Sequence, residues 1–248
     1  KLIEKDLLKF NLKKRFVKKK MVFKNQIYLK NISFSYPNEN KHILKKFNLL
    51  IPKNKFICIT GESGIGKTTI IDILSAILEP KFGNVFVDGK KITKANKISW
   101  QKNIGYVSQN IILFDGSIKE NIAFSENDKI SIKGVNKAIE LSNLKKFISS
   151  KKNGIEFKIN ERGINLSGGQ IQRIGIARSL YYDPELLIFD EFTSSLDKEN
   201  EQYILKSLEL LKRKKTIVAI THNIEVIKKA DKVIYLVKDK NGELKKKS

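Results

Sequence analysis

A glycine-rich stretch in the first third of the chain has the residue types that hold a nucleotide phosphate. Its glycines allow a tight turn and let successive backbone N–H groups approach phosphate oxygens closely. The lysine that follows would reach the β- and γ-phosphates, the next hydroxyl would ligate Mg²⁺, and the following helix would add its positive dipole end. The stretch predicts a bound nucleotide and comprises Gly61, Glu62, Ser63, Gly64, Ile65, Gly66, Lys67 and Thr68, with Thr69 in the same phosphate-binding set.

An acidic pair follows a hydrophobic run at residues 186–189. The carboxylate of Asp190, at the end of this predicted strand, would hold Mg²⁺ through water, and Glu191 would polarise an attacking water. Two acids after a strand can also cap the next helix. Because a phosphate loop stands upstream, the pair favours nucleotide hydrolysis, with Asp190 as metal ligand and Glu191 as catalytic base.

A second glycine-containing stretch opens a predicted helix over residues 168–181. A glycine-rich helix start supplies further N–H donors and a positive helix end for phosphate. One chain therefore carries two phosphate-binding elements and one acidic pair, a combination that suits an ATP-driven dimer. The second stretch reads Leu166, Ser167, Gly168, Gly169 and Gln170.

With these motifs in this order, the chain resembles the nucleotide-binding domain of an ATP-binding cassette (ABC) transporter, over about residues 27–237. The resemblance implies ATP and Mg²⁺ as cofactors. It also implies roles for single residues. Tyr36 would stack on adenine, and Gln109 would sense Mg²⁺ and the γ-phosphate. Asp197, in the 194–197 loop, would contact the nucleotide across subunits, and His222 would hold the γ-phosphate and the attacking water.

The resemblance also implies a head-to-tail homodimer. In such a dimer Ser167 and Gly169 act on the ATP held by the partner's phosphate loop, so that two subunits bury two ATP molecules and a lone subunit hydrolyses poorly. The preference for adenine over guanine is inherited from the family, because stacking on Tyr36 tolerates either base.

Two segments are similar to those of exporters. Residues 111–122 resemble the segment on which coupling helices of the transmembrane domain dock, and residues 161–163 resemble a loop that relays this contact. The amino-acid sequence at residues 100–102 and 173–178 is similar to that of bacterial flippases for lipid-linked oligosaccharides. The expected cargo is a lipid, a lipid-linked glycan or a drug-like molecule, and the expected location is the cytoplasmic face of the inner membrane.

Two other functions remain open. One is a soluble ABC ATPase that acts on nucleic acid or ribosomes, and the other is a separate importer ATPase subunit.

Three positions depart from the family pattern. Asn160 stands where glycine is common, Ile171 replaces a basic residue after the second glycine-containing stretch, and Phe192 replaces a small residue or proline after the catalytic glutamate.

The net charge of +23, from 49 Lys and Arg against 26 Asp and Glu, invites a nucleic-acid or anionic-membrane partner. Only five of these cations are arginine, the residue preferred for bidentate readout of bases and phosphates. Lysines spread among many Asn and Ile residues are typical of an AT-rich coding sequence. We therefore expect no specific nucleic-acid partner.

The single cysteine, Cys58, excludes an intramolecular disulfide framework and lies in an apolar run, which predicts a buried side chain. The sequence has no apolar stretch long enough for a membrane span. It begins at Lys1 with its only methionine at Met21, and we expect a segment of a longer protein. Residues 1–26 are interpreted as a basic connector from a membrane domain, with a lipid-bound amphipathic helix as the alternative.

Strands and helices alternate along the rest of the chain. This alternation predicts an α/β fold of the P-loop NTPase (RecA-like) type with a mostly parallel core. An N-terminal antiparallel β-subdomain and an inserted helical subdomain at about 110–172 complete the nucleotide-binding domain, 27–248, whose polar tail, 238–248, is expected to be frayed. We expect strands at 27–36, 42–51, 56–60, 84–89, 104–108, 186–189, 216–220 and 232–237, and helices at 68–78, 168–181, 198–212 and 224–230, with helical character at 118–147.

Overall fold

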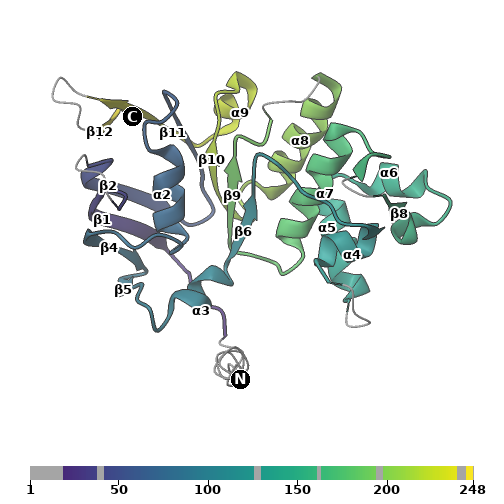
Figure 1. The fold of residues 1–248 in the computed structure, drawn as a ribbon, viewed down its shortest axis with the longest axis horizontal. Coiled ribbons are helices and arrows are strands. Elements are labelled where there is room, and N and C mark those ends of the chain that lie inside the picture. The colour runs from purple at the N-terminus through teal and green to yellow at the C-terminus, as the bar shows by residue number, and fades with distance from the viewer. Residues whose placement is uncertain are drawn as a thin grey trace, which may run out of the picture.

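The computed structural model describes residues 19–37, 42–125, 130–160, 163–193, 198–238 and 244–247 (Figure 1). Most of the predicted connector, residues 1–18, therefore lies outside the described residues. Within the described ranges, no helix has both the length and the apolar character that crossing a membrane requires. The fold contains two larger sheets and a group of helices beside them.

The smaller of these two sheets is antiparallel and uses the first strands of the chain. Its order is β2 (Leu44–Pro52), β1 (Gln26–Phe34), β4 (Phe82–Val87) and β5 (Lys90–Lys91). Ile27 and Leu29 alternate with more exposed residues along β1, as expected for a sheet with one buried face. The predicted N-terminal antiparallel subdomain is confirmed.

The larger sheet is mostly parallel. Neighbouring strands pair in parallel from β11 to β6, and only β12 runs antiparallel. Its order is β12 (Leu244–Lys247), β11 (Lys232–Lys238), β3 (Phe56–Gly61), β10 (Thr216–Ile220), β9 (Leu186–Asp190) and β6 (Ile104–Val107). The α/β fold class predicted from the alternation is confirmed.

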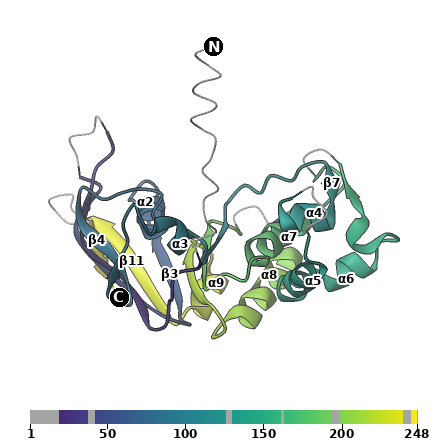
Figure 2. The same cartoon turned by 90° about the horizontal axis from the view of Figure 1, so that it is seen from below.

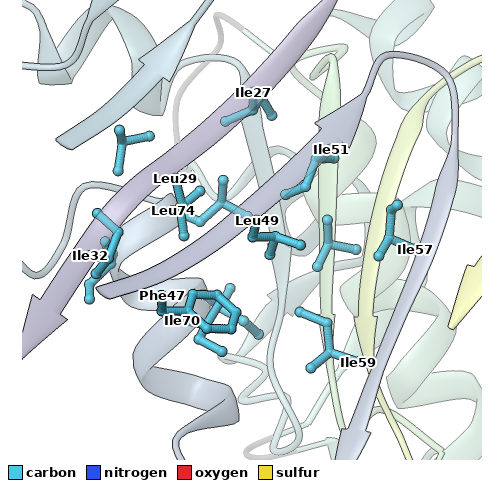
Figure 3. Packing of buried hydrophobic residues seen from close by; sticks show 14 of the residues in the cluster. Ile27, Leu29, Ile32, Phe47, Leu49, Ile51, Ile57, Ile59, Ile70 and Leu74 are labelled. Carbon is cyan, nitrogen blue, oxygen red and sulfur yellow. The ribbon is translucent and has the colours of Figure 1, made fainter. Parts of the chain in front are cut away.

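Alternate residues of the buried strands feed two different cores. In β9, Ile188 packs in the core shared with the antiparallel sheet and α2 (Lys67–Leu74), whereas Phe189 packs in the core shared with the other helices. Figure 3 shows the first core, with Ile70 and Leu74 of α2 between the two sheets. Helices α7 (Gly168–Leu180) and α8 (Lys198–Leu211) cover the opposite face, as Figures 1 and 2 show.

The helical region between 118 and 149 is divided into three helices. The backbone turns left-handed at Phe124 (φ 51°) and Asn143 (φ 56°), which ends one helix before the next begins. The elements of this region are α4 (Ile118–Ala123), α5 (Ile132–Leu141), α6 (Lys145–Ser149), the short 3-10 helix η1 (Gly154–Glu156), and the paired strands β7 (Gly116–Ser117) and β8 (Lys158–Ile159). Two more short helices are α3 (Lys97–Gln101) and α9 (Ile224–Lys229).

Two local expectations were wrong. The helix predicted over 68–78 ends at Leu74, because the backbone becomes left-handed at Ala76 (φ 55°). The tail is not simply frayed, since Leu244–Lys247 form strand β12 along the edge of β11. A lysine-rich strand gives little signal by itself, because the pairing comes from the neighbouring strand.

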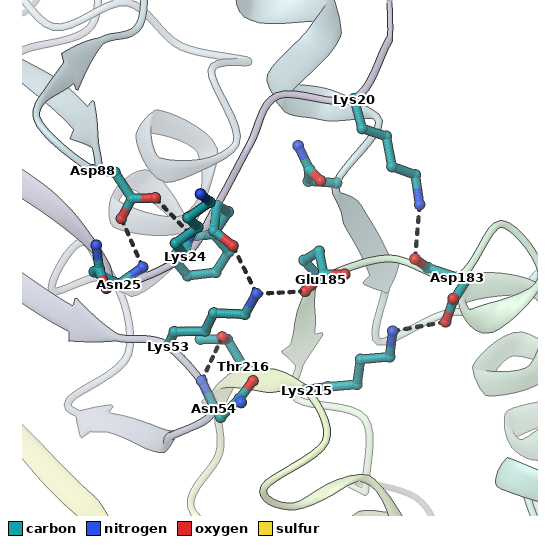
Figure 4. A network of polar contacts seen from close by, with 12 residues as sticks. Lys20, Lys24, Asn25, Lys53, Asn54, Asp88, Asp183, Glu185, Lys215 and Thr216 are labelled. Carbon is teal, nitrogen blue, oxygen red and sulfur yellow. Dashed lines mark hydrogen bonds and ion pairs between the residues drawn. The ribbon is translucent and has the colours of Figure 1, made fainter.

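Residues 19–25 are fastened to the domain at several points (Figure 4). The Lys20 ammonium donates to the backbone oxygens of Tyr182 and Asp183, both at 2.7 Å, just after α7. Phe23 is buried and packs edge-on against Trp100, with ring centroids 6.0 Å apart. The carboxylate of Asp88 accepts from the backbone N–H groups of residues 24–26. This segment therefore joins the antiparallel sheet to the turn that follows α7.

Candidate nucleotide-binding site

The glycine-rich loop lies where strand β3 passes into helix α2. Gly61 ends the strand with φ 149°, and a Cβ on it would lie 2.6 Å from the backbone oxygen of Leu236, so only glycine fits. Gly66 is the N-cap of α2 and supplies no side-chain cap. The N–H groups at the start of α2 are therefore not capped by the side chain before them, an arrangement suited to phosphate oxygens.

Lys67 is hydrogen-bonded to the glycine-rich loop and lies next to His222. Its side chain is 5% exposed, and its ammonium donates to the backbone oxygens of Gly61 (2.7 Å) and Glu62 (3.0 Å). The same nitrogen lies 3.3 Å from His222 Nε2. Residues that are 155 positions apart in the sequence are thus brought together. A cation between the loop and His222 is placed to neutralise a terminal phosphate.

The predicted adenine-stacking residue lies beside the same helix start. Tyr36 is half-buried, packs edge-on against Phe34 at 5.0 Å between ring centroids, and places its hydroxyl 3.2 Å from Thr69 Oγ1. Thr68, in contrast to Thr69, is exposed. The structure therefore brings Tyr36 to the phosphate loop and leaves the Thr68 hydroxyl accessible for a ligand.

Asp190 is the last residue of β9 and is held by a tyrosine. The hydroxyl of Tyr106 donates to Asp190 Oδ2 at 2.9 Å. Burial raises the pKa of Asp190, and the negative charge of Glu191 adds to this, while the Tyr106 hydrogen bond and the positive charge of Lys67 lower it. The carboxylate thus lies within the electrostatic reach of the phosphate-loop lysine.

Glu191 occupies a strained turn at the end of β9. Its φ is 46°, which a non-glycine residue adopts at a cost of about 1–3 kcal/mol. Its N–H donates to the oxygen of Ile220 at 2.9 Å, so the end of β10 fixes the turn. A pocket is lined by Glu191, Thr193, Thr221, His222 and Asn223. The carboxylate and the imidazole therefore border one space large enough for water.

Gln109 follows the edge strand β6 and is exposed. Because β3, β6, β9 and β10 run parallel, their carboxyl ends lie at one edge of the sheet. That edge carries the glycine loop, Gln109, the acidic pair and His222. Chemistry-bearing residues from four separate strands thus gather where parallel sheets usually bind ligands.

The second glycine-containing stretch does not join this cluster within one chain. Ser167 is the N-cap of α7, its Oγ accepts from the N–H of Gln170 (3.3 Å), and Gln170 Oε1 accepts from the N–H of Ser167 (3.1 Å). Gly168 is exposed, whereas Gly169 is buried. Among the described residues, no hydrogen bond or ion pair joins 167–170 to the phosphate loop, since α7 and α2 cover opposite faces of the sheet (Figure 2).

Some predicted residues lie outside the described ranges. These are Asp197, with the rest of the 194–197 loop, and residues 161–162 of the exporter-type loop. Phe192, a departure from the family pattern, is buried and packs against Phe189 with ring centroids 4.7 Å apart. Its bulk therefore fills the core under the α7 face and does not enter the pocket next to Glu191.

Sequence reasoning missed Tyr106 as a member of the site. The strand period indicates that it shares a face with Ile104, but its distance to Asp190 depends on the pairing register of β6 with β9. It likewise missed Thr193, Thr221 and Asn223, which line the pocket because they flank the acid and the histidine. The sequence signal that could have identified them is their position as polar residues within two positions of Glu191 or His222.

Comparison with known proteins identifies the family. A family profile described as "ABC transporter" matches residues 44–194. The chain is 36% identical over 213 residues to the "ATP-dependent lipid A-core flippase" of Vibrio vulnificus (strain CMCP6), covering 86% of this chain and 36% of that protein. It is 36% identical over 220 residues to "ABC transporter B family member 1" of Dictyostelium discoideum, covering 88% of this chain and 24% of that protein.

A solved structure agrees with this result. A bacterial Atm1-family ABC exporter with ATP bound matches with a TM-score of 0.78 and 31% sequence identity, covering 91% of this chain and 39% of that one. The chain therefore spans well under half of the length of these relatives. The profile match covers more than half of the chain, so the chain belongs to the ABC transporter family and is an ATP-binding ATPase domain of that family.

Proposed function

We propose, from the chain's membership of the ABC transporter family, that it is the ATP-driven motor of an exporter and works as a head-to-tail homodimer. The observation that supports this proposal is the position of the two predicted phosphate-binding elements, at the starts of α2 and α7, on opposite faces of one sheet. The phosphate loop has the acids and His222 beside it, whereas the Ser167 end of α7 has none of them. A second chain turned head to tail would bring its Ser167 end to the first chain's phosphate loop.

In this proposal the hydrolytic step uses the pocket beside β9. Glu191 accepts a proton from water as that water attacks the γ-phosphorus and the bond to the bridging β-phosphate oxygen breaks, which releases ADP and phosphate, and His222 orients the water and the phosphate. Lys67 neutralises the β- and γ-phosphates, and Tyr36 stacks on the base. Ser167, Gly168, Gly169 and Gln170 of one chain, with Asp197, contact the ATP of the other, which burial between two chains protects from bulk water.

The donor set at the site fits Mg²⁺. No group of three or more His, Cys, Asp or Glu residues converges anywhere in the described part of the chain. A metal here would depend on the Thr68 hydroxyl, the Gln109 amide oxygen, the Asp190 carboxylate and the phosphates of ATP, which are all hard oxygen ligands. Mg²⁺ typically binds through one or two carboxylates plus substrate phosphates. The bound ion would offset negative charge that develops on the phosphates.

Export is supported by the kind of relatives that the chain matches. Their names include a lipid A-core flippase and an ABC exporter. We propose that coupling helices of a transmembrane domain dock on residues 111–122, at the cytoplasmic face of the inner membrane. The cargo class is a lipid, a lipid-linked glycan or a drug-like molecule. Residues 19–25, which are fastened to α3 and to the turn after α7, would form the end of the connector from that membrane domain.

Mixed dimers test the motor. A chain with Ser167→Arg is paired with a chain with Glu191→Gln, and the heterodimer is purified through two different affinity tags. If Ser167 acts on the partner's ATP, one site carries both changes and the other carries neither, so about half of the ATPase activity should remain. The matched control places both changes in one chain paired with an unchanged chain, and it should be inactive.

The reverse outcome would contradict the head-to-tail arrangement. Activity in the control but not in the mixed dimer would place Ser167 in its own chain's site. ATP hydrolysis that depends on added RNA or DNA would favour the nucleic-acid alternative. ATPase activity should instead be insensitive to nucleic acid, and binding of nucleic acid should fall steeply with salt because only phosphate charge is recognised.

A further inference from the structure

Tyr106 lies on the same face of the sheet as Asp190. In the parallel ladder of β6 and β9, Tyr106 pairs with Ile188, which is two residues before Asp190. Side chains two apart on a strand point to the same face, so the ring of Tyr106 can reach diagonally along this face. Its hydroxyl donates a hydrogen bond to Asp190 Oδ2 at 2.9 Å across this diagonal pair.

The bond lies at the open edge of the sheet. Tyr106 is 36% exposed, whereas its neighbours Gly105 and Val107 are buried on the α7 side of the strand. The site of contact is therefore not in the hydrophobic core, where a tyrosine would mainly fill space.

Asp190 also has neighbours that pull its carboxylate in different directions. Lys67 attracts it, and Glu191 repels it. Asp72 of α2 lies within electrostatic reach of both Asp190 and Tyr106. Without a fixed donor, a carboxylate among one cation and two acids has several orientations available. A single neutral donor at Oδ2 selects one of them.

We propose that Tyr106 is a positioning residue for Asp190, and that its hydroxyl fixes one carboxylate oxygen so that the other is presented to the metal ion of the ATP site. The proposal rests on the assignment of Asp190 as a Mg²⁺-binding residue. Hydrogen-bond partners that orient a metal-binding side chain typically change metal affinity 10- to 100-fold when they are lost. The expected ligand is Mg²⁺ in complex with ATP.

The test removes only the hydroxyl. In the Tyr106→Phe chain, calorimetry should show MgATP binding weakened by about 10-fold, with binding of ATP in EDTA unchanged. The Mg²⁺ concentration for half-maximal ATPase activity should rise by a similar factor. Tyr235→Phe is the matched control, because Tyr235 is an exposed tyrosine of β11, a strand separated from β9 by β3 and β10. It should leave both affinities unchanged.

Two outcomes overturn the inference. One is equal loss of affinity for ATP with and without Mg²⁺, which would mean that Tyr106 supports the strand and not the metal. The other is no change in either affinity. An Asp190→Asn chain distinguishes a failure of the inference from a failure of the proposed site. If Asp190→Asn weakens MgATP binding selectively and Tyr106→Phe does not, only the inference about Tyr106 fails. If the Asp190→Asn chain has a normal Mg²⁺ dependence, the assignment of Asp190 as a metal ligand is itself refuted.

Discussion

Replacement of Gly61 by alanine should damage the phosphate loop more than replacement of Gly64. At Gly61 the new Cβ would lie 2.6 Å from the backbone oxygen of Leu236, and the φ of 149° is a conformation that side chains rarely adopt. Backbone strain of this kind costs about 1–3 kcal/mol, and overpacking against an immobile neighbour costs about 1–3 kcal/mol more. The overlap cannot be relieved by a rotamer change, since Leu236 O belongs to the ladder between β3 and β11.

Gly64→Ala is the matched control for Gly61→Ala. Gly64 also has a positive φ (71°), but a Cβ there would meet no atom within 4 Å. The left-handed backbone alone costs about 1–2 kcal/mol. Because both variants carry positive-φ strain and only Gly61→Ala also meets a neighbour, urea unfolding should give free energies of unfolding that differ by the overpacking cost of about 1–3 kcal/mol, with Gly61→Ala lower. Equal values, or a more stable Gly61→Ala chain, would refute the steric reasoning.

Four further changes test the site and its supports, with Lys19→Met as a control for the last. Glu191→Gln should retain ATP affinity but lose about 10²–10⁴-fold in turnover because the general base is gone, and near-normal steady-state hydrolysis would contradict its role. Lys67→Ala should weaken nucleotide binding and abolish hydrolysis, whereas Tyr36→Ala should mainly weaken binding, by about 1–3 kcal/mol from lost stacking, as calorimetry can measure. Lys20→Met should speed hydrogen exchange at the Met21 amide, which donates to Ser99, while Lys19→Met should not.

The sheet could be predicted because its signal is local. Buried strands such as 186–189 are continuous apolar runs, and the glycine loop follows one of them directly. The family resemblance also implies that Lys67 and His222 both act on the γ-phosphate, and in the structure Lys67 Nζ lies 3.3 Å from His222 Nε2. What the spacing cannot supply is the register between strands. The Tyr106 to Asp190 contact depends on that register, and no pattern in either segment indicates it alone.

Helix ends were predicted less well than helix positions. The stop after Leu74 comes from a left-handed residue that is alanine, not glycine, so the usual terminating signal is missing. Phe124 is the left-handed C-cap of α4, and the left-handed Asn143 directly follows the C-cap of α5; a phenylalanine gives no warning of this conformation. At Ala76 and Phe124 the tertiary structure imposes a backbone conformation against the local preference of the residue, whereas asparagine adopts the left-handed conformation readily, so Asn143 is an ordinary helix-terminating residue.

The two ends of α7 contact segments that are far apart in the sequence. At its start, Ser167 and Gln170 cap each other's N–H groups, and Gly168 stays exposed for a ligand. Beyond its end, the Lys20 ammonium binds the backbone oxygens of Tyr182 and Asp183, where the negative end of the helix dipole favours a cation. A helix is stiff along its axis, so any displacement of Ser167 along α7 would also displace the turn at residues 182–183, to which Lys20 is hydrogen-bonded. The segment that carries Lys20 is thus connected to the second glycine-containing stretch through α7, although 147 positions separate Lys20 from Ser167 in the sequence.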